Sequence, residues 1–148
     1  MNSRRKLMRL GIPVALCLLA ALAVVKRSSA SIGNITKADL TGSWQLSLYG
    51  QGGCGVGTTQ VNFTLNSSGV SNNATSKAHN VGCGDSTSTG NTFTITSLAA
   101  NGSGIAGLSC GVGCGFTFAI QVSPDRSSFN AVDVTDPGNF LGGVAIHQ

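Results

Sequence analysis

The sequence predicts an all-β protein: an eight-stranded antiparallel up-and-down meander closed as a small barrel. Beyond the first thirty residues, apolar and polar side chains alternate with a period of two, which is typical of half-buried strands. Turn residues such as Pro, Gly and Asn separate these alternating runs at regular intervals. No run in this part of the chain has helical periodicity, so we expect strands and turns alone.

The first thirty residues have the pattern of a secretory signal. Cations between Arg4 and Arg9 precede an apolar run from Leu10 to Val25, and small residues follow up to Ala30. We expect cleavage after Ala30, so that residues 31–148 form a single β-barrel domain. An uncleaved membrane anchor is the alternative, but the apolar run is shorter than the roughly 20 residues of a membrane span.

Cleavage would change the charge of the protein. The full chain has a net charge of +4, but only Lys37, Lys77 and Arg126 remain after residue 30, against five aspartates and no glutamate. The resulting net charge of −2 argues against nucleic-acid binding and against attraction to an anionic membrane, both of which need a basic surface. We expect no nucleic-acid partner, and no membrane association after cleavage.

The first four strands are expected in the first half of the domain. Trp44, Leu46 and Leu48 alternate with polar residues in the first run, and Phe63 and Phe93 belong to similar runs. The third run is the weakest because Ala and Asn dominate it. The expected ranges are 42–50, 58–66, 69–78 and 90–98.

The last four strands follow the same rule. Phe116 and Phe118 alternate with Thr117 and Ala119, and the fifth run is weak because it contains several glycines. The expected ranges are 103–110, 114–123, 127–135 and 139–147. On the last strand we expect Phe140, Val144 and Ile146 to face the core.

Short turns join these strands in order, and closure into a barrel removes both edges of the sheet. A two-sheet β-sandwich is the alternative. In a meander, the first, third and fifth connections lie at the same end, and these connections carry all four cysteines that remain after the signal. The agreement between strand count and cysteine position supports the meander.

An even number of cysteines in an exported chain predicts two disulfides. Cys110 and Cys114 flank a three-residue loop that sets them opposite each other, which leaves Cys54 to pair with Cys83. Cross-pairings stay open, because all four thiols share one end. A four-cysteine zinc site is the rival, but the spacing lacks paired C-x₂-C motifs.

The segment from Asp39 to Trp44, with its Gly-x-Trp motif on the first strand, resembles the opening of the calycin barrels, lipocalins and avidins, and is most similar to bacterial lipocalin-like secreted domains. The resemblance implies that Trp44 is structural and plugs the closed end of the barrel. Avidins place polar residues after this tryptophan to hold biotin, whereas this chain has Leu46 and Gly50, so biotin binding is not implied. The family's arginine on the last strand, which stacks on the tryptophan, is also absent.

Two motifs match catalytic or nucleotide-binding patterns. Residues 107–111 fit G-x-S-x-G and residues 102–107 fit G-x-G-x-x-G, but both motifs need a following helix, and a strand is expected here. We therefore interpret both as consequences of a glycine-rich chain.

Several polar residues are candidates for a site. His79 and Asp85 share a rim with Asp136 and offer metal ligands or an acid–base pair, although a solvated polar loop explains them as well. Asp133 and Asn139, beside Asp136, are oxygen ligands suited to calcium, although turn formation accounts for these residues. His147 is expected to be an exposed tail residue.

We expect a secreted or periplasmic, non-enzymatic barrel without cofactor or metal. Its partner would be a small apolar ligand that enters from the cysteine-loop end. The expected lining residues are Leu46, Leu48, Phe63, Phe93, Phe118 and Phe140. The alternative is a structural or surface-interaction protein with a filled core, and a hydrolase is the least supported class. The interior decides between the first two, because a cavity favours a ligand and a filled core favours a structural role.

Overall fold

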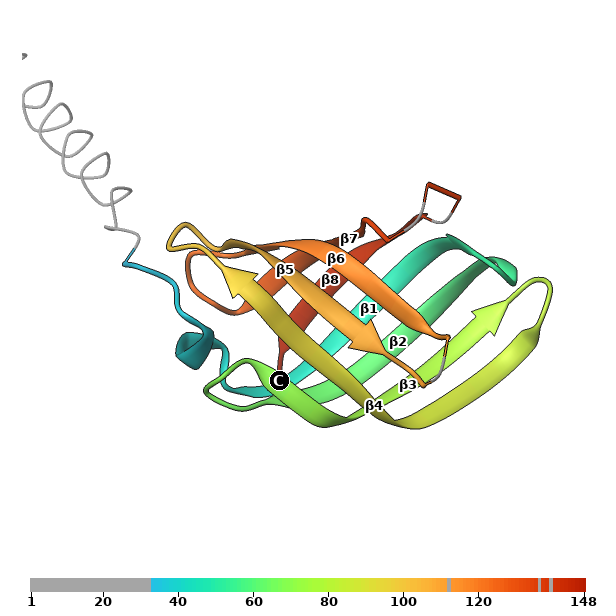
Figure 1. Ribbon diagram of the computed structural model, residues 1–148, viewed down its shortest axis with the longest axis horizontal. Helices are drawn as coiled ribbons and strands as arrows, with labels where there is room; N and C mark the ends of the chain where they lie inside the picture. Colours follow the sequence, from blue (N-terminus) through green and yellow to red (C-terminus); the bar gives the residue numbers. More distant parts are fainter. Residues whose placement is uncertain (1–32, 112, 136, 139) are drawn as a thin grey trace, which may run out of the picture. The chain divides into compact units, whose positions relative to one another are not determined.

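The computed structural model describes residues 33–148 except residues 112, 136 and 139, so the predicted signal and its cleavage site lie outside the described residues. Eight strands follow one another, and each pairs antiparallel with the next (Figure 1). They are β1 (Gly42–Gly52), β2 (Gly55–Leu65), β3 (Val70–Asn80), β4 (Gly84–Leu98), β5 (Ser103–Ser109), β6 (Gly115–Val122), β7 (Ser128–Asp133) and β8 (Phe140–His147). Pairing of β8 with β1 closes the barrel, which confirms the predicted fold and excludes the sandwich.

The strands beside the first two cysteine-bearing turns are longer than predicted at this end. Strand β4 begins at Gly84 rather than at residue 90, and β2 begins at Gly55 rather than at residue 58. Glycines suggested loops here, yet Gly52 and Gly55 form the last pair of the first hairpin. The Ser and Thr residues after Gly84 pair with β3, because short polar and β-branched side chains suit a solvated strand. Within the described residues, no helix is long and apolar enough to cross a membrane.

Side chains of alternate residues fill the barrel. The largest fully buried aromatic residues are Trp44, Phe93, Phe118 and Phe129, and they pack with Leu, Ile and Val from the other strands. The rings of Phe63 and Phe93 stack with centroids 4.1 Å apart. An eight-stranded barrel is just wide enough for side chains to fill its interior, and the buried side chains here form one packed cluster.

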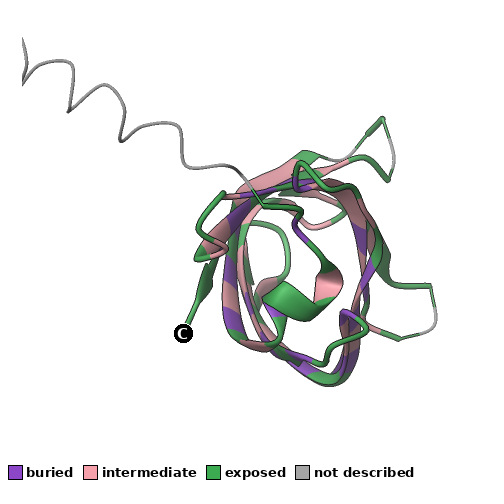
Figure 2. Cartoon of the chain, turned by 90° about the vertical axis from the view of Figure 1, so that its left-hand side faces the viewer, coloured by how far each residue is buried: buried purple, intermediate pink, exposed green. Residues whose placement is uncertain are grey.

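The segment that precedes β1 closes one end of the barrel. The short 3₁₀-helix η2 (Lys37–Leu40) lies across the opening of the barrel (Figure 2). Its last residue, Leu40, is fully buried, and its carbonyl accepts a hydrogen bond of 2.8 Å from Trp44 Nε1. Trp44 is 1% exposed. Its predicted burial is confirmed, and its position beneath η2 agrees with a plug at the closed end.

The β6–β7 turn holds this closed end from outside. Arg126, in the left-handed region at φ 62°, places its Nε 3.7 Å from Asp39 Oδ2. Its Nη2 also donates to the carbonyl of Gly33 at 3.5 Å. The carboxylate of Asp39 accepts hydrogen bonds from the backbone N–H and hydroxyl of Thr36, which lowers the pKa of Asp39 below its ordinary value, with a smaller contribution from Arg126.

The predicted inward face of the last strand is wrong. Register with β1 sets Ala145 opposite Leu46 and Gly143 opposite Leu48, so the small residues of β8 face the core. Phe140, Val144 and Ile146 face outward and are exposed, Phe140 to 62%. The consecutive glycines of this strand hide its alternation, and a Cβ at Gly143 would collide with the backbone of Ser47 on β1.

The prediction that His147 is an exposed tail residue is also incomplete. His147 is the partner of Trp44 in the β1–β8 register, and its ring packs on the indole with centroids 4.8 Å apart. Its imidazole therefore covers the indole from the last strand.

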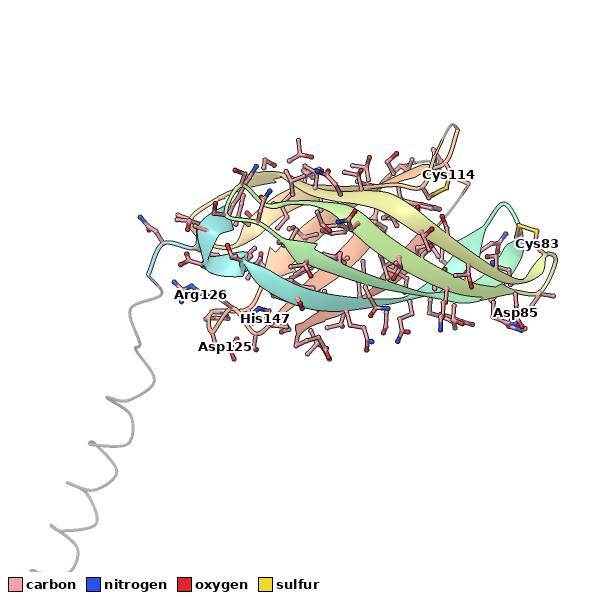
Figure 3. The ribbon with its side chains drawn as sticks, turned by 90° about the horizontal axis from the view of Figure 1, so that it is seen from below. Cys83, Asp85, Cys114, Asp125, Arg126 and His147 are labelled. Atoms are coloured by element: carbon pink, nitrogen blue, oxygen red, sulfur yellow. A yellow bond between two sulfur atoms is a disulfide. The ribbon has the colours of Figure 1, made fainter. Side chains whose placement is uncertain are left out.

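Both predicted disulfides are present. Cys54 bonds to Cys83 with their Cα atoms 5.4 Å apart, and Cys110 bonds to Cys114 with Cα atoms 5.2 Å apart. Cys83 and Cys114 lie at the end of the barrel opposite Arg126 and His147 (Figure 3). The position of the cysteines at one end, expected from the meander, is confirmed.

Candidate functional site

The predicted apolar ligand site coincides with the packed core. Leu46, Leu48, Phe63, Phe93 and Phe118 are all buried, and each is at most 4% exposed. Their neighbours in the core include Ile95, Val61 and Phe129. Phe140 is not among them, because it points away from the interior. The structure thus brings five of the six predicted residues together, but as packing partners of one another.

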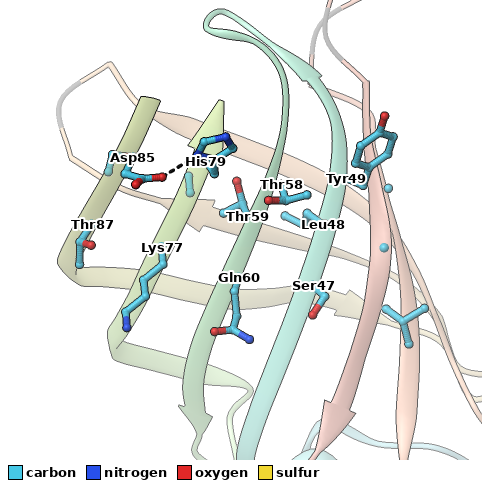
Figure 4. Close-up of a pocket in the computed structure, with 15 residues that line it drawn as sticks. Ser47, Leu48, Tyr49, Thr58, Thr59, Gln60, Lys77, His79, Asp85 and Thr87 are labelled. Carbon is cyan, nitrogen blue, oxygen red and sulfur yellow. Dashed lines mark hydrogen bonds and ion pairs between the residues drawn. The ribbon is translucent and has the colours of Figure 1, made fainter. Parts of the chain in front are cut away.

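A second location is a hollow on the outer surface of the barrel, with a volume of about 800 Å³. Two rows of outward-facing side chains cross it, following the register from β8 through β1, β2 and β3 to β4. The first row is Val144, Ser47, Gln60, Lys77 and Thr87, and the second is Gly142, Tyr49, Thr58, His79 and Asp85. We call this hollow the outer groove (Figure 4).

The polar end of the outer groove contains an ordered His–Asp pair. His79 and Asp85 are direct partners in the β3–β4 register, and His79 Nδ1 lies 2.6 Å from Asp85 Oδ1. A carboxylate at this distance accepts the Nδ1 proton, which leaves Nε2 free to face a ligand. Both side chains are mostly exposed, so the pair lies in solvent and not in a dry cavity.

Lys77 lies two residues before His79 on the same face of β3 and carries the positive charge of the outer groove. Lys37 donates to the carbonyl of Thr96, and Arg126 faces Asp39. Among the cationic residues that the structure describes, Lys77 is thus the one whose charged group has no hydrogen-bond or ion-pair partner. Its ammonium group is available to an anion from outside the chain.

Tyr49 supplies the aromatic surface of the outer groove. Its side chain is 64% exposed, and its position in the register lies between Thr58 and Gly142. Because Gly142 has no side chain, one flank of the tyrosine ring is uncovered. The neighbouring Thr58 adds a hydroxyl group in the same row.

The Cys54–Cys83 disulfide fixes the rim beside the outer groove. It joins the β1–β2 turn to the β3–β4 turn, and Gly82 N donates to the carbonyl of Cys54 at 2.9 Å. The backbone N–H of Val81 also donates to the carbonyl of Val56 at 3.0 Å. The two hairpins that carry most of the groove are therefore held together at their tips.

Apolar residues form a second surface feature next to the outer groove. Val132, Phe140, Val144 and Ile146 are all exposed on the outer face of β7 and β8, and we call them the apolar patch. Val144 belongs to both the patch and the groove. Clustered exposed apolar side chains on a small domain indicate an interaction surface.

The other candidate residues form no metal site in the described structure. Asp133 accepts the backbone N–H of Thr135 at 2.9 Å, as a turn residue does, while Asp136 and Asn139 lie outside the described residues. No group of three or more His, Cys, Asp or Glu residues capable of holding a metal occurs in the described part of the chain. Ser109 and the glycines of the two glycine-rich motifs lie on β5 or in the turns beside it, and β6 follows.

The outer groove is the feature that reading the sequence missed. The alternation places Ser47, Tyr49 and Gln60 on outward faces, but it does not predict that these residues are neighbours on one surface. Their proximity depends on the register between strands, which local patterns do not encode. His79 and Asp85 were expected in a loop, and the longer β3 and β4 instead make them neighbours across a strand pair.

Comparison with known proteins leaves the family open. No family model matches the chain, and no curated protein sequence matches it. A solved structure of a redesigned β-barrel is similar to it, with 16% sequence identity and a TM-score of 0.48, over 78% of this chain and 98% of that chain. The fold assignment rests on the strand pairings: this chain forms an eight-stranded antiparallel closed barrel, and the likeness to lipocalins and avidins is a resemblance of topology and of one short motif.

Proposed function

We propose that the mature protein is an exported, non-catalytic binding barrel of lipocalin-like architecture that holds a small ligand in its outer groove. The ligand lies on the outside of the barrel rather than in its interior, toward the cysteine-loop end. Two disulfides are compatible with an oxidising location outside the cytoplasm.

One observation carries the proposal. The outer groove has a volume of about 800 Å³, within the range of roughly 300–1,000 Å³ typical of small-molecule sites, whereas the interior residues predicted to hold a ligand pack against one another. The groove also combines an exposed aromatic ring with hydroxyl, amide and charged groups. Such a mixture orients a ligand by hydrogen bonds while the ring covers its apolar side.

A non-catalytic role is supported by the exposure of the polar groups. His79 and Asp85 have the geometry of a base and its orienting carboxylate, but their side chains are 71% and 88% exposed. Electrostatic catalysis depends on groups arranged in a water-excluded site. The same pair is well suited to hydrogen bonding with a ligand that remains in contact with water.

Mapping with small organic probes tests the location of the site. We would titrate ¹⁵N-labelled exported protein with 2-propanol and with phenol and follow the amide shifts by NMR. We expect shifts at Tyr49, Thr58 and His79 and unchanged core amides such as those of Leu46 and Phe93. Tyr49→Ala should reduce the phenol shifts, whereas Val56→Ala, at an exposed position outside the outer groove, should not. Shifts confined to core residues would contradict the proposal.

The apolar patch supports a second candidate, self-association through the outer face of β7 and β8. The register neighbours of Val144 are Ser47 and Asn130, and those of Ile146 are Gln45 and Ser128. None of these carries a charge, so two copies of the face meet without repulsion. Sedimentation equilibrium tests this candidate: it predicts a dimer that Ile146→Ser converts to monomer, and a monomeric wild-type protein would rule it out.

A further inference from the structure

We propose that the outer groove binds a saccharide that carries a carboxylate group. This inference rests on the proposed function, because it names the ligand class of the same site. It depends on three features that occur together in the groove: a free ammonium group, an exposed aromatic ring, and a cross-strand series of hydrogen-bonding side chains.

The ammonium group of Lys77 selects an anion. Its neighbours in the register are Gln60 on β2 and Thr87 on β4, both uncharged, so no carboxylate of the groove competes for it in its own row. The carboxylate of Asp85 lies in the adjacent row and is already bonded to His79. One unengaged monovalent cation complements one monovalent anion, and a carboxylate meets this requirement.

The ring of Tyr49 selects a ligand with an apolar face. A pyranose ring presents C–H groups on its face and hydroxyl groups around its edge. An exposed tyrosine ring beside the flat backbone of Gly142 leaves space for such a face to pack. Aromatic side chains with one polar tip suit ligands that stay partly in water.

The remaining side chains match the hydroxyl groups of a sugar. Ser47, Thr58 and Thr87 each both donate and accept, and Gln60 does the same through its amide. Bonding of Nδ1 of His79 to Asp85 leaves Nε2 to accept a hydroxyl proton. A neutral apolar ligand would leave these groups without partners, so the lining favours a polyhydroxylated molecule.

The length of the outer groove favours an oligosaccharide over a single sugar. The groove crosses five adjacent strands from β8 to β4, and neighbouring strands lie about 4.8 Å apart. The rows therefore extend roughly 19 Å across the sheet. Tyr49 and Asp85 are near opposite ends of one row, with Thr58 and His79 between them.

Titration with tri-galacturonate, and with its trimethyl ester as a matched neutral probe, tests the inference. We expect tri-galacturonate to shift the amides of Tyr49, Lys77 and His79 in the exported protein. The trimethyl ester keeps every ring and hydroxyl group but lacks all three carboxylate charges. Because Lys77 pairs with one of these carboxylates, we expect the affinity of the ester to be about tenfold lower, as for the loss of one charge-assisted hydrogen bond. Lys77→Met should lower the affinity for tri-galacturonate by a similar factor. Lys37→Met, which removes a cation outside the groove, should leave it unchanged.

The outcomes separate this inference from the function on which it rests. Equal affinity for the acid and the ester, or no effect of Lys77→Met, would overturn the assignment of a carboxylate. Absence of groove shifts with tri-galacturonate at millimolar concentration would overturn the saccharide class, while occupancy of the groove by 2-propanol and phenol would still support a binding site there. If those probes also avoid the groove, the proposed function fails together with the inference.

Discussion

The imidazole of His147 packs on the indole of Trp44, with ring centroids 4.8 Å apart and ring planes inclined by 32°. The contact joins the first strand of the barrel to the last, because the two residues are direct partners in the β1–β8 register. Gly42 makes room for it: its φ is +133°, and a Cβ at this position would collide with the His147 ring. The β1–β8 pairing that closes the barrel therefore also brings His147 over the buried tryptophan.

The first prediction concerns Trp44. Trp44→Ala removes a buried indole and its hydrogen bond to Leu40, so we expect the free energy of unfolding to fall by about 3–5 kcal/mol. Urea unfolding measures this loss. Tyr49→Ala, which removes an exposed aromatic residue, is the matched control and should change stability by about 0.5 kcal/mol or less. Equal effects of the two substitutions would contradict the structural role of Trp44.

His147→Ala should have a smaller effect than Trp44→Ala. It removes one aromatic contact from an exposed side chain, and such pairs contribute about 0.5–1.5 kcal/mol. The indole also becomes more accessible, so we expect its fluorescence emission to move to longer wavelength. Unchanged emission together with unchanged stability would show that His147 does not cover Trp44 in solution.

The two disulfides should differ in their contributions to stability. Cys54 and Cys83 are separated by 29 residues in sequence, and Cys110 and Cys114 by 4. Restricting the unfolded chain predicts about 3.6 kcal/mol for the longer loop and about 2 kcal/mol for the shorter one. Cys54→Ser with Cys83→Ser should therefore lower the free energy of unfolding more than Cys110→Ser with Cys114→Ser. The reverse order would contradict this account, and a peptide linking residue 54 to residue 110 would contradict the pairing itself.

Acid should destabilise the closed end through Asp39. The hydrogen bonds from Thr36 lower the pKa of Asp39 in the folded protein below its ordinary value of 3.8, with a further contribution from Arg126. Its stabilising effect is fully present above pH 3.8 and is lost as the pH falls through the lower folded pKa. Asp39→Asn should therefore reduce the loss of stability between about pH 5 and about pH 2. An identical loss in the variant and the wild type would show that Asp39 is not involved.

We also predict export with cleavage after Ala30. Protein recovered from the periplasm or the medium should begin at Ser31, and intact mass spectrometry measures this directly. Recovery in the membrane fraction alone, with residues 1–30 attached, would show that the N-terminal segment is an anchor.

The sequence was sufficient to predict the strand order and the end of the barrel that carries the cysteines, and it favoured the observed disulfide pairing without excluding cross-pairings. Alternation and turn residues define the eight strands, and the position of Cys54, Cys83 and Cys110 on odd-numbered connections is a consequence of the meander. The burial of Trp44, Phe93 and Phe118 follows from the same alternation. These features depend on local patterns and on the parity of the turns, both of which can be read along the chain.

The surface site depends on information that is not local. Tyr49 and His79 become neighbours of Thr58 through two strand registers, and Phe140 faces outward because β1 sets the register of β8. Adjacent glycines at 142 and 143 left the alternation of the last strand ambiguous. A shift of one residue in such a strand exchanges its inner and outer faces. The prediction therefore places Phe140, Val144 and Ile146 in the core, whereas the structure places them in the apolar patch.

We expect the barrel interior to be solid and recognition to take place on its outer surface. A crystal of the exported protein under xenon pressure tests this claim most directly, because xenon occupies apolar cavities that exist inside a folded protein. The packing of Phe63 on Phe93 and the burial of Leu46 and Phe118 predict no ordered xenon among these residues. An ordered xenon atom bounded by these side chains would reveal an apolar cavity and return the ligand to the interior.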